Sequence, residues 1–141
     1  MIPQFRMLTK VKRLREEKAL RALEAARAAH RKAVERAEAL TAEAEESIRT
    51  LSARERALYE TILQKVVSMG AVDDVKEQVL QLMTEHQALL DRRDRAWEHA
   101  ARCEAKVVEA RVELRRRQAD VEKIVTITDE LVQADIAEKT A

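Results

Sequence analysis

The stretch SMGAVDD, residues 68–74, decides the fold of this chain. It holds Gly70, the only glycine among 141 residues, while the only proline is Pro3 at the extreme start. The sequences on either side of Gly70 are rich in Ala, Leu, Glu, Lys, Arg and Gln, the residues that lose least free energy on entering a helix. We therefore predict two long helices joined by one turn.

The residues around Gly70 also suggest how the turn is built. Glycine readily takes the left-handed conformation that ends a helix. Asp73 or Asp74 can cap the following helix, and Asp74 with Glu77 fits a capping box. A connection this short predicts antiparallel helices. The expected fold is all-α, a long antiparallel two-helix coiled-coil hairpin forming a single domain over residues 1–141, with helix one about 5–68, the turn about 69–72 and helix two about 73–137.

Apolar residues in the second arm recur at alternating steps of four and three. The positions are Val75, Val79, Leu82, His86, Leu89, Arg93, Ala96, Ala100, Cys103, Val107, Ala110, Leu114, Arg117, Val121, Ile124, Thr128, Leu131 and Asp135. The heptad phase never slips, which predicts a sustained coiled-coil seam. The polar members, such as Arg93 and Arg117, can extend their charged heads to water while their stems pack.

The first arm shows a less regular stripe made mostly of alanine. It runs through Ala19, Ala22, Ala26, Ala29, Ala33, Ala37, Leu40, Ala44, Ile48, Leu51, Glu55, Leu58, Ile62 and Val66. Several steps of four follow one another, so the supercoil is expected to relax locally. Met7, Val11 and Leu14 begin a separate phase, which predicts a shift near Lys18.

The two arms are nearly equal in length, so a hairpin would pair residues whose numbers add up to about 143. Residues 6–21 carry seven basic and two acidic side chains, a net charge of +5, and residues 129–141 carry a net charge of −3. The hairpin brings these segments together. Each surface ion pair adds only ~0.2–1 kcal/mol, so we expect orientation rather than stability from them.

Composition excludes several classes of function. Charged residues make up 38% of the chain and aromatic residues 2%, which is typical of a coiled coil. The net charge of +1 argues against bulk binding to nucleic acid or to an anionic membrane. No window approaches the ~20 apolar residues of a membrane span, and no signal peptide is evident. A single cysteine, Cys103, favours the cytoplasm.

No arrangement of residues predicts an active site. One glycine cannot make a phosphate-binding loop. His99 and Cys103 lie one helical turn apart, but the further ligands that a metal needs are missing. Cys103 is explained by its seam position as a small hydrophobic residue. We therefore expect no enzyme activity and no catalytic, metal or cofactor-binding residues.

Tyr59 and Trp97 are large aromatic residues on the predicted arms, and neither falls on the seam. Tyr59 belongs to a group of apolar residues near the turn, here called the turn-side cluster: Leu58, Tyr59, Ile62, Leu63, Leu82 and Met83. This cluster is wider than one seam requires. It either thickens the local core or presents a partner-binding surface, because exposed apolar patches usually mark interaction sites.

The opening VKRLREEKALRALEAARAAH, residues 11–30, resembles the start of the YscO/FliJ family of type III secretion proteins, and the YscO branch fits better. The resemblance implies a cytoplasmic antiparallel helical hairpin, similar to the γ-subunit stalk of rotary ATPases. It also implies a central-stalk protein that sits in the hexameric export ATPase, links it to the export gate protein and binds or recycles secretion chaperones.

These expectations give two hypothetical sites. The basic cluster, Arg6, Lys10, Lys12, Arg13 and Arg15, would bind the ATPase, and the turn-side cluster would bind the export gate or a chaperone. Two alternatives remain open: a structural coiled-coil stalk or scaffold whose hairpin opens to dimerise, and a holdase chaperone. We favour a monomeric hairpin, although the same seam could also pair between two chains.

Overall fold

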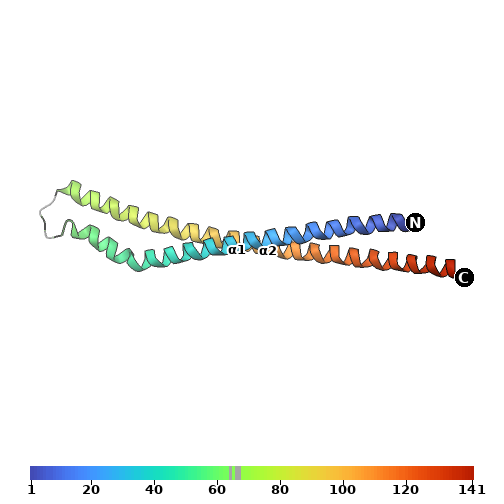
Figure 1. Ribbon diagram of the computed structural model, residues 1–141. Helices are drawn as coiled ribbons and strands as arrows, with labels where there is room; N and C mark the ends of the chain where they lie inside the picture. The colour runs from blue at the N-terminus through green and yellow to red at the C-terminus, as the bar shows by residue number, and fades with distance from the viewer. Residues whose placement is uncertain (64, 66–67) are drawn as a thin grey trace. The chain divides into compact units, whose positions relative to one another are not determined.

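The computed structural model describes residues 1–141 except 64, 66 and 67. The chain forms two helices, α1 (Ile2–Glu60) and α2 (Met69–Thr140), and the described residues contain no strand (Figure 1). This confirms the all-α fold with two long helices in a hairpin. The rich supply of strong helix formers explains why both helices run for many turns without interruption.

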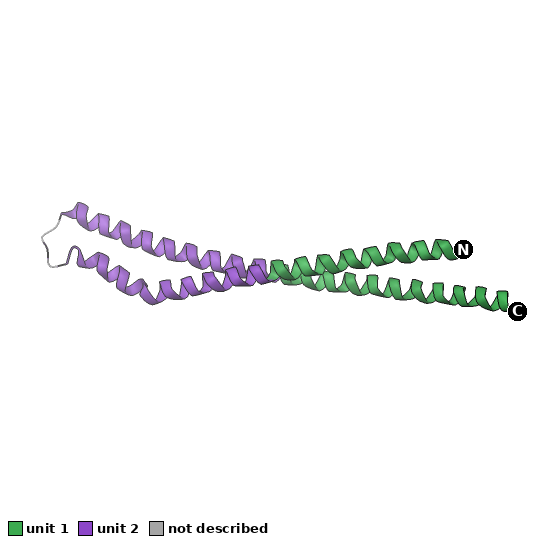
Figure 2. Cartoon of the chain, in the orientation of Figure 1, with its two compact units in different colours: residues 1–30, 102–141 green, residues 31–101 purple. Residues whose placement is uncertain are grey.

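Residues of both helices combine in two compact units (Figure 2). Unit 1 contains residues 1–30 and 102–141, and unit 2 contains residues 31–101. Within each unit a segment of α1 packs against a segment of α2 that runs in the opposite direction. The single domain that we expect over residues 1–141 stays a prediction.

Helix α1 ends at Glu60, so the prediction that helix one extends to about residue 68 is wrong. The backbone tightens there, because the amide of Thr61 bonds the carbonyl of Leu58 at 3.3 Å and that of Ile62 bonds Tyr59 at 3.1 Å. The Thr61 hydroxyl also donates to the Leu58 carbonyl at 2.7 Å. Two consecutive β-branched residues, which lose side-chain freedom in a helix, favour an end at this point.

Helix α2 begins at Met69, earlier than predicted, because Ser68 caps it. The Ser68 Oγ accepts a hydrogen bond from the amide of Ala71 at 3.2 Å, three residues into the helix, as an N-cap serine does. The predicted caps at Asp73 and Asp74 are therefore wrong, since both residues already lie within the helix. Gly70 lies in the first turn of α2 rather than in a left-handed turn.

Replacing Gly70 with alanine is expected to leave stability unchanged or raise it by up to about 1 kcal/mol, because alanine loses less backbone entropy in a helix. A Cβ atom at Gly70 would meet the Ser68 Oγ at 3.8 Å, an ordinary contact. Thermal unfolding followed by circular dichroism measures the effect. The reverse change at the next residue, Ala71→Gly, is the control and should lower the melting temperature. A lower melting temperature for Gly70→Ala would mean that Gly70 takes the left-handed conformation predicted from the sequence.

The predicted seam of the second arm is confirmed. Each of its positions from Val75 to Asp135 is buried or half-buried. Buried members include Ala100, Cys103 and Val107. The heptad pattern succeeds here because large apolar residues alternate with charged ones, so one face of the helix is clearly marked.

The predicted stripe of the first arm is partly wrong. Ala22, Ala29 and Ile48 are exposed, while neighbouring residues one position away take their places on the seam. Val66, the last residue of that stripe, lies outside the described residues. The observed seam follows Ile2, Phe5, Thr9, Lys12, Glu16, Ala19, Leu23, Ala26, His30, Ala33, Ala37, Leu40, Ala44, Ser47 and Leu51.

This seam alternates steps of three and four without a break, so the phase shift predicted near Lys18 does not occur. One irregularity follows, where two steps of four lead from Ser47 through Leu51 to half-buried Glu55. Such an extra step locally unwinds the supercoil. The local relaxation of the supercoil that we expected along the first arm is therefore confined to the segment from Ser47 to Glu55.

Polar pairs across the seam mark the register of the two helices. In unit 1 the hydroxyls of Thr9 and Thr128 lie 3.5 Å apart, and in unit 2 the Ser47 Oγ lies 2.7 Å from the His86 Nδ1. In both pairs the two residue numbers add up to less than the predicted sum of about 143. The sum is smaller because the turn precedes Gly70 instead of containing it. A polar layer of this kind fixes register in coiled coils at some cost in stability.

Candidate protein-binding surfaces

Four of the five residues of the basic cluster are exposed on α1 of unit 1. They are Arg6, Lys10, Arg13 and Arg15. Lys12 differs, because it is half-buried on the seam and its Nζ lies 4.0 Å from the Asp120 Oδ2 of α2. The predicted ATPase-binding group thus divides into four cations that face solvent and one that joins the two helices.

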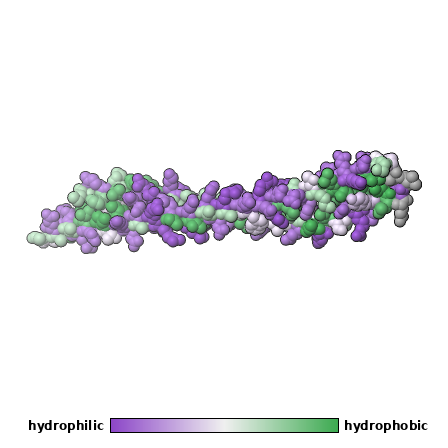
Figure 3. Space-filling model, turned by 180° about the vertical axis from the view of Figure 1, so that it is seen from behind, coloured by the Kyte–Doolittle hydropathy of each residue, from purple (hydrophilic) through white to green (hydrophobic). Residues whose placement is uncertain are grey.

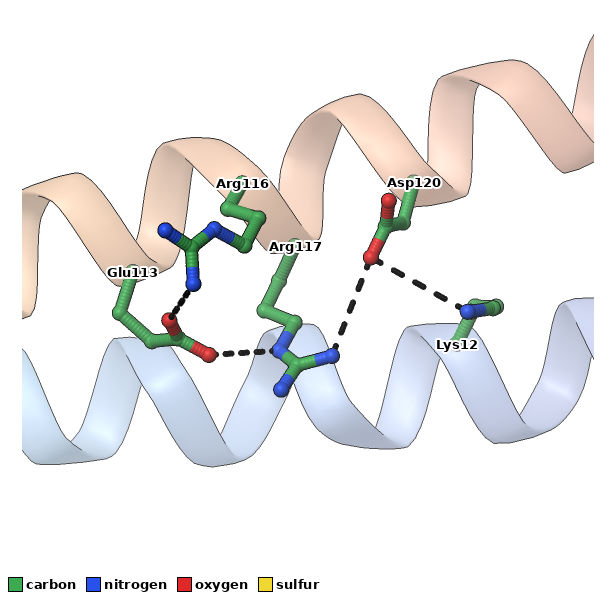
Figure 4. Close-up of polar contacts among 5 residues, drawn as sticks. All are labelled: Lys12, Glu113, Arg116, Arg117 and Asp120. Atoms are coloured by element: carbon green, nitrogen blue, oxygen red, sulfur yellow. Dashed lines mark hydrogen bonds and ion pairs between the residues drawn. The ribbon is translucent and has the colours of Figure 1, made fainter.

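Asp120 belongs to a small ionic network in unit 1 (Figure 4). It contacts Lys12 on α1 and also the Arg117 guanidinium, at 3.8 Å. Glu113 accepts from the Arg117 Nε at 2.8 Å and from Arg116 at 3.3 Å. These side chains are about one-third exposed or more, apart from Lys12, so each pair is worth only ~0–1 kcal/mol. Only the pair of Lys12 with Asp120 joins α1 to α2, while the other pairs lie within α2.

The exposed cations at the start of α1, in unit 1, have no such partners. Among the residues that the structure describes, no ion pair involves Arg6, Lys10, Arg13, Arg15, Lys18 or Arg21. The resulting basic surface can attract an acidic partner and steer its approach.

The turn-side cluster in unit 2 is partly buried and partly exposed to solvent. Leu58, Ile62, Leu82 and Met83 are half-buried, whereas Tyr59 is 37% exposed and Leu63 is 56% exposed. On the face shown in Figure 3, hydrophobic side chains gather beside the grey residues of the turn. The cluster therefore lies partly against its neighbours and partly, at Tyr59 and Leu63, on the surface.

Two further apolar residues near the turn escaped the sequence interpretation. Met69 and Leu80 are both exposed large hydrophobic residues. Leu80 follows the seam residue Val79 directly, so its off-seam position was visible in the heptad pattern. Met69 was assigned to the turn and is instead the first residue of α2.

Trp97 joins the two helices in unit 2. Its Nε1 donates to the Thr41 Oγ1 at 2.9 Å, and that hydroxyl donates to the Ala37 carbonyl at 2.8 Å. The indole thus satisfies its polar atom while leaving part of its ring at the surface, as tryptophan commonly does. Its first role is to tie α2 to α1 beside the seam.

An open groove of about 670 Å³ lies in unit 2 where the α1 seam slips. Its lining includes Ser47 and His86, together with Arg54, which donates to both the Oγ and the carbonyl of Ser47 at 3.0 Å. The other lining side chains are mainly charged or hydroxyl-bearing, among them Glu43, Glu46, Thr50, Glu85 and Arg92. Thr50 and Arg54 both donate to Ser47, so the groove contains the polar layer that Ser47 forms with His86.

Over residues 1–63, 65 and 68–141, no group of three His, Cys, Asp or Glu side chains could hold a metal ion. Cys103 is buried on the α2 seam, as its sequence position indicates. In the described part of the chain, neither helix has a stretch apolar enough to cross a membrane.

Fold and surfaces together define a helical-hairpin protein that carries a basic patch in one unit and an apolar patch in the other. The family model described as "Type III secretion protein YscO" matches residues 5–141, nearly the whole chain. The chain therefore belongs to the YscO family of type III secretion proteins. Comparisons with the curated proteins and with the solved structures find no significant match.

Proposed function

We propose that this protein is the central-stalk component of a type III secretion export ATPase complex. It sits in the hexameric ATPase ring at the cytoplasmic face of the secretion apparatus, links the ring to the export gate protein, and binds or recycles secretion chaperones. Membership of the YscO family supports a place in the secretion apparatus. The more specific role depends on the surfaces of the two units.

The observation that carries the proposal is the unequal charge of the two helices in unit 1. Residues 6–21 of α1 carry a net charge of +5, while residues 129–141 of α2 carry a net charge of −3 and include the exposed carboxylates Asp129, Glu130 and Glu138. A helix pair with one basic and one acidic side contacts the identical subunits of a ring differently, subunit by subunit. Such asymmetry is what a stalk inside a ring requires, because equal contacts would favour no particular orientation.

Unit 2 serves the second partner. The turn-side cluster in unit 2 exposes Tyr59 and Leu63, and tyrosine is enriched where binding energy is concentrated. The gate or chaperone site is therefore assigned to this apolar surface, separate from the charged ATPase site. Because the seam is satisfied within each unit, a monomeric hairpin can present both surfaces at once.

Reversing three exposed cations, Lys10→Glu, Arg13→Glu and Arg15→Glu together, is expected to weaken ATPase binding and stimulation about tenfold or more. Like charges facing each other across an interface cost several kcal/mol. Lys12 stays unchanged, because it contacts Asp120. The measurements are affinity for the purified export ATPase and its rate of ATP hydrolysis.

A matched variant separates this site from a general charge effect. Arg31→Glu, Lys32→Glu and Arg36→Glu also reverse three exposed cations, but in unit 2. This variant should bind and stimulate like the wild type, and circular dichroism should show both variants fully helical. Equal losses for both variants, or no loss for either, would refute the assignment of the ATPase site to the basic cluster.

A further inference from the structure

A second apolar stripe lies on α1 of unit 1, away from the seam. It consists of Met7, Val11 and Leu14, here called the outer stripe. Steps of four and three place these residues on one helical face. Met7 is 63% exposed and Leu14 is 57% exposed, with half-buried Val11 between them. The seam in the same segment runs through Thr9 and Lys12 instead, so the packing of α1 on α2 leaves the outer stripe largely uncovered.

Cations surround the outer stripe. Lys10 lies one helical turn from both Met7 and Leu14, and Lys18 lies one turn beyond Leu14. Neither cation forms an ion pair among the described residues. Glu17 is the one carboxylate one turn away from Leu14. The surface thus combines an apolar ridge with a mainly positive border.

We propose that the outer stripe docks into an apolar groove, bordered by carboxylates, on a protein partner. This inference rests on the proposed function and deepens it, since the partner is then the export ATPase. The cations of the basic cluster steer the encounter, and Met7 and Leu14 supply the apolar anchors. Anchors of this kind carry most of the binding energy of an interface, while charges at its border mainly affect the association rate.

Charge distribution favours a protein groove over a lipid surface. Asp129 lines one groove together with Arg6 and Arg13, so carboxylates lie close to the cations of the same unit. An anionic bilayer would repel the acidic α2 residues while attracting α1. The outer stripe is also narrow, because the opposite apolar face of α1 is occupied by α2, whereas helices that bind membrane surfaces insert a broad apolar face.

The test compares two double variants that both exchange exposed apolar residues of unit 1 for alanine. The outer-stripe variant is Met7→Ala with Leu14→Ala. The control is Val108→Ala with Val112→Ala, at side chains that are 53% and 48% exposed on α2. Alanine preserves the helices. We expect the outer-stripe variant to bind the purified export ATPase about tenfold more weakly or worse, and the control to bind within about twofold of the wild type.

The outcomes are distinct. If the outer-stripe variant binds as tightly as the wild type, the inference is wrong while the proposed function stands. If the wild type itself fails to bind the ATPase, both are wrong. Two further experiments test other binding partners of the outer stripe. If the wild type binds phosphatidylglycerol vesicles and the outer-stripe variant does not, the partner is a membrane and the inference is wrong. If sedimentation of the chain alone shows self-association that the outer-stripe variant loses, the partner is a second copy of the chain and the inference is again wrong.

Discussion

The variant Leu23→Ala is expected to lose about 2 kcal/mol or more of its free energy of unfolding. Truncating a buried leucine removes its transfer free energy and leaves a cavity that the surroundings fill only in part. Leu23 is 3% exposed, and its α1 neighbours on the seam, Ala19 and Ala26, are small. It therefore supplies much of the apolar area that α1 buries in this part of unit 1.

Leu20→Ala is the matched control, because it makes the same chemical change three residues away at a side chain that is 44% exposed. This variant should lose well under 1 kcal/mol, since surface substitutions usually stay within about 0.5 kcal/mol. Urea unfolding followed by helical circular dichroism measures both. If the two variants lost similar free energies of unfolding, Leu23 would not lie on the seam. The seam would then follow the alanine stripe through Ala22 that the sequence predicts.

The contrast between the two arms shows what heptad patterns can predict. In α2 the seam is marked by large apolar residues such as Val107 and Ile124, and every predicted position is at least half-buried. In α1 alanine occurs on several faces, and its single methyl group contributes too little burial to distinguish them. The true seam includes His30 and Ser47, which are polar and were therefore left out of a stripe traced through apolar residues.

The turn shows a different limit. Gly70 permits a left-handed conformation but does not require one, so its presence could not decide where α1 ends. The deciding contact is the Ser68 hydroxyl on the Ala71 amide. Ser68 was visible in the sequence as a potential cap, but Asp73 and Asp74 offered equivalent signals further on. Local signals of equal strength therefore left the helix boundary undetermined.

The candidate sites depended on long-range packing to different degrees. Exposure of Lys10, Arg13 and Arg15 follows from charge alone, because cations rarely lie buried without a partner. Lys12 looks identical in the sequence, yet it lies on the seam, where its Nζ is 4.0 Å from the Asp120 Oδ2 of the other helix. Only the register of α1 against α2 separates it from its neighbours, and that register was predicted several residues away from its true value.

The double variant Tyr59→Ala with Leu63→Ala is expected to weaken binding to the gate or chaperone partner about thirtyfold, which corresponds to ~2 kcal/mol. Both side chains are exposed at the turn end of unit 2, so their loss opens no internal cavity. The melting temperature should therefore change little. Affinity is measured separately for the purified secretion chaperones and for the cytoplasmic part of the export gate protein, which tells the two partners apart.

Two control variants complete the experiment. Ile48→Ala removes a side chain that is 58% exposed in the same unit but outside the turn-side cluster, so binding should stay unchanged. Leu58→Ala removes a half-buried member of the cluster, so the melting temperature should fall. If the double variant instead behaved like Leu58→Ala, losing stability while retaining partner binding at low temperature, the cluster would be a local core. The partner surface would then have to lie elsewhere on the hairpin.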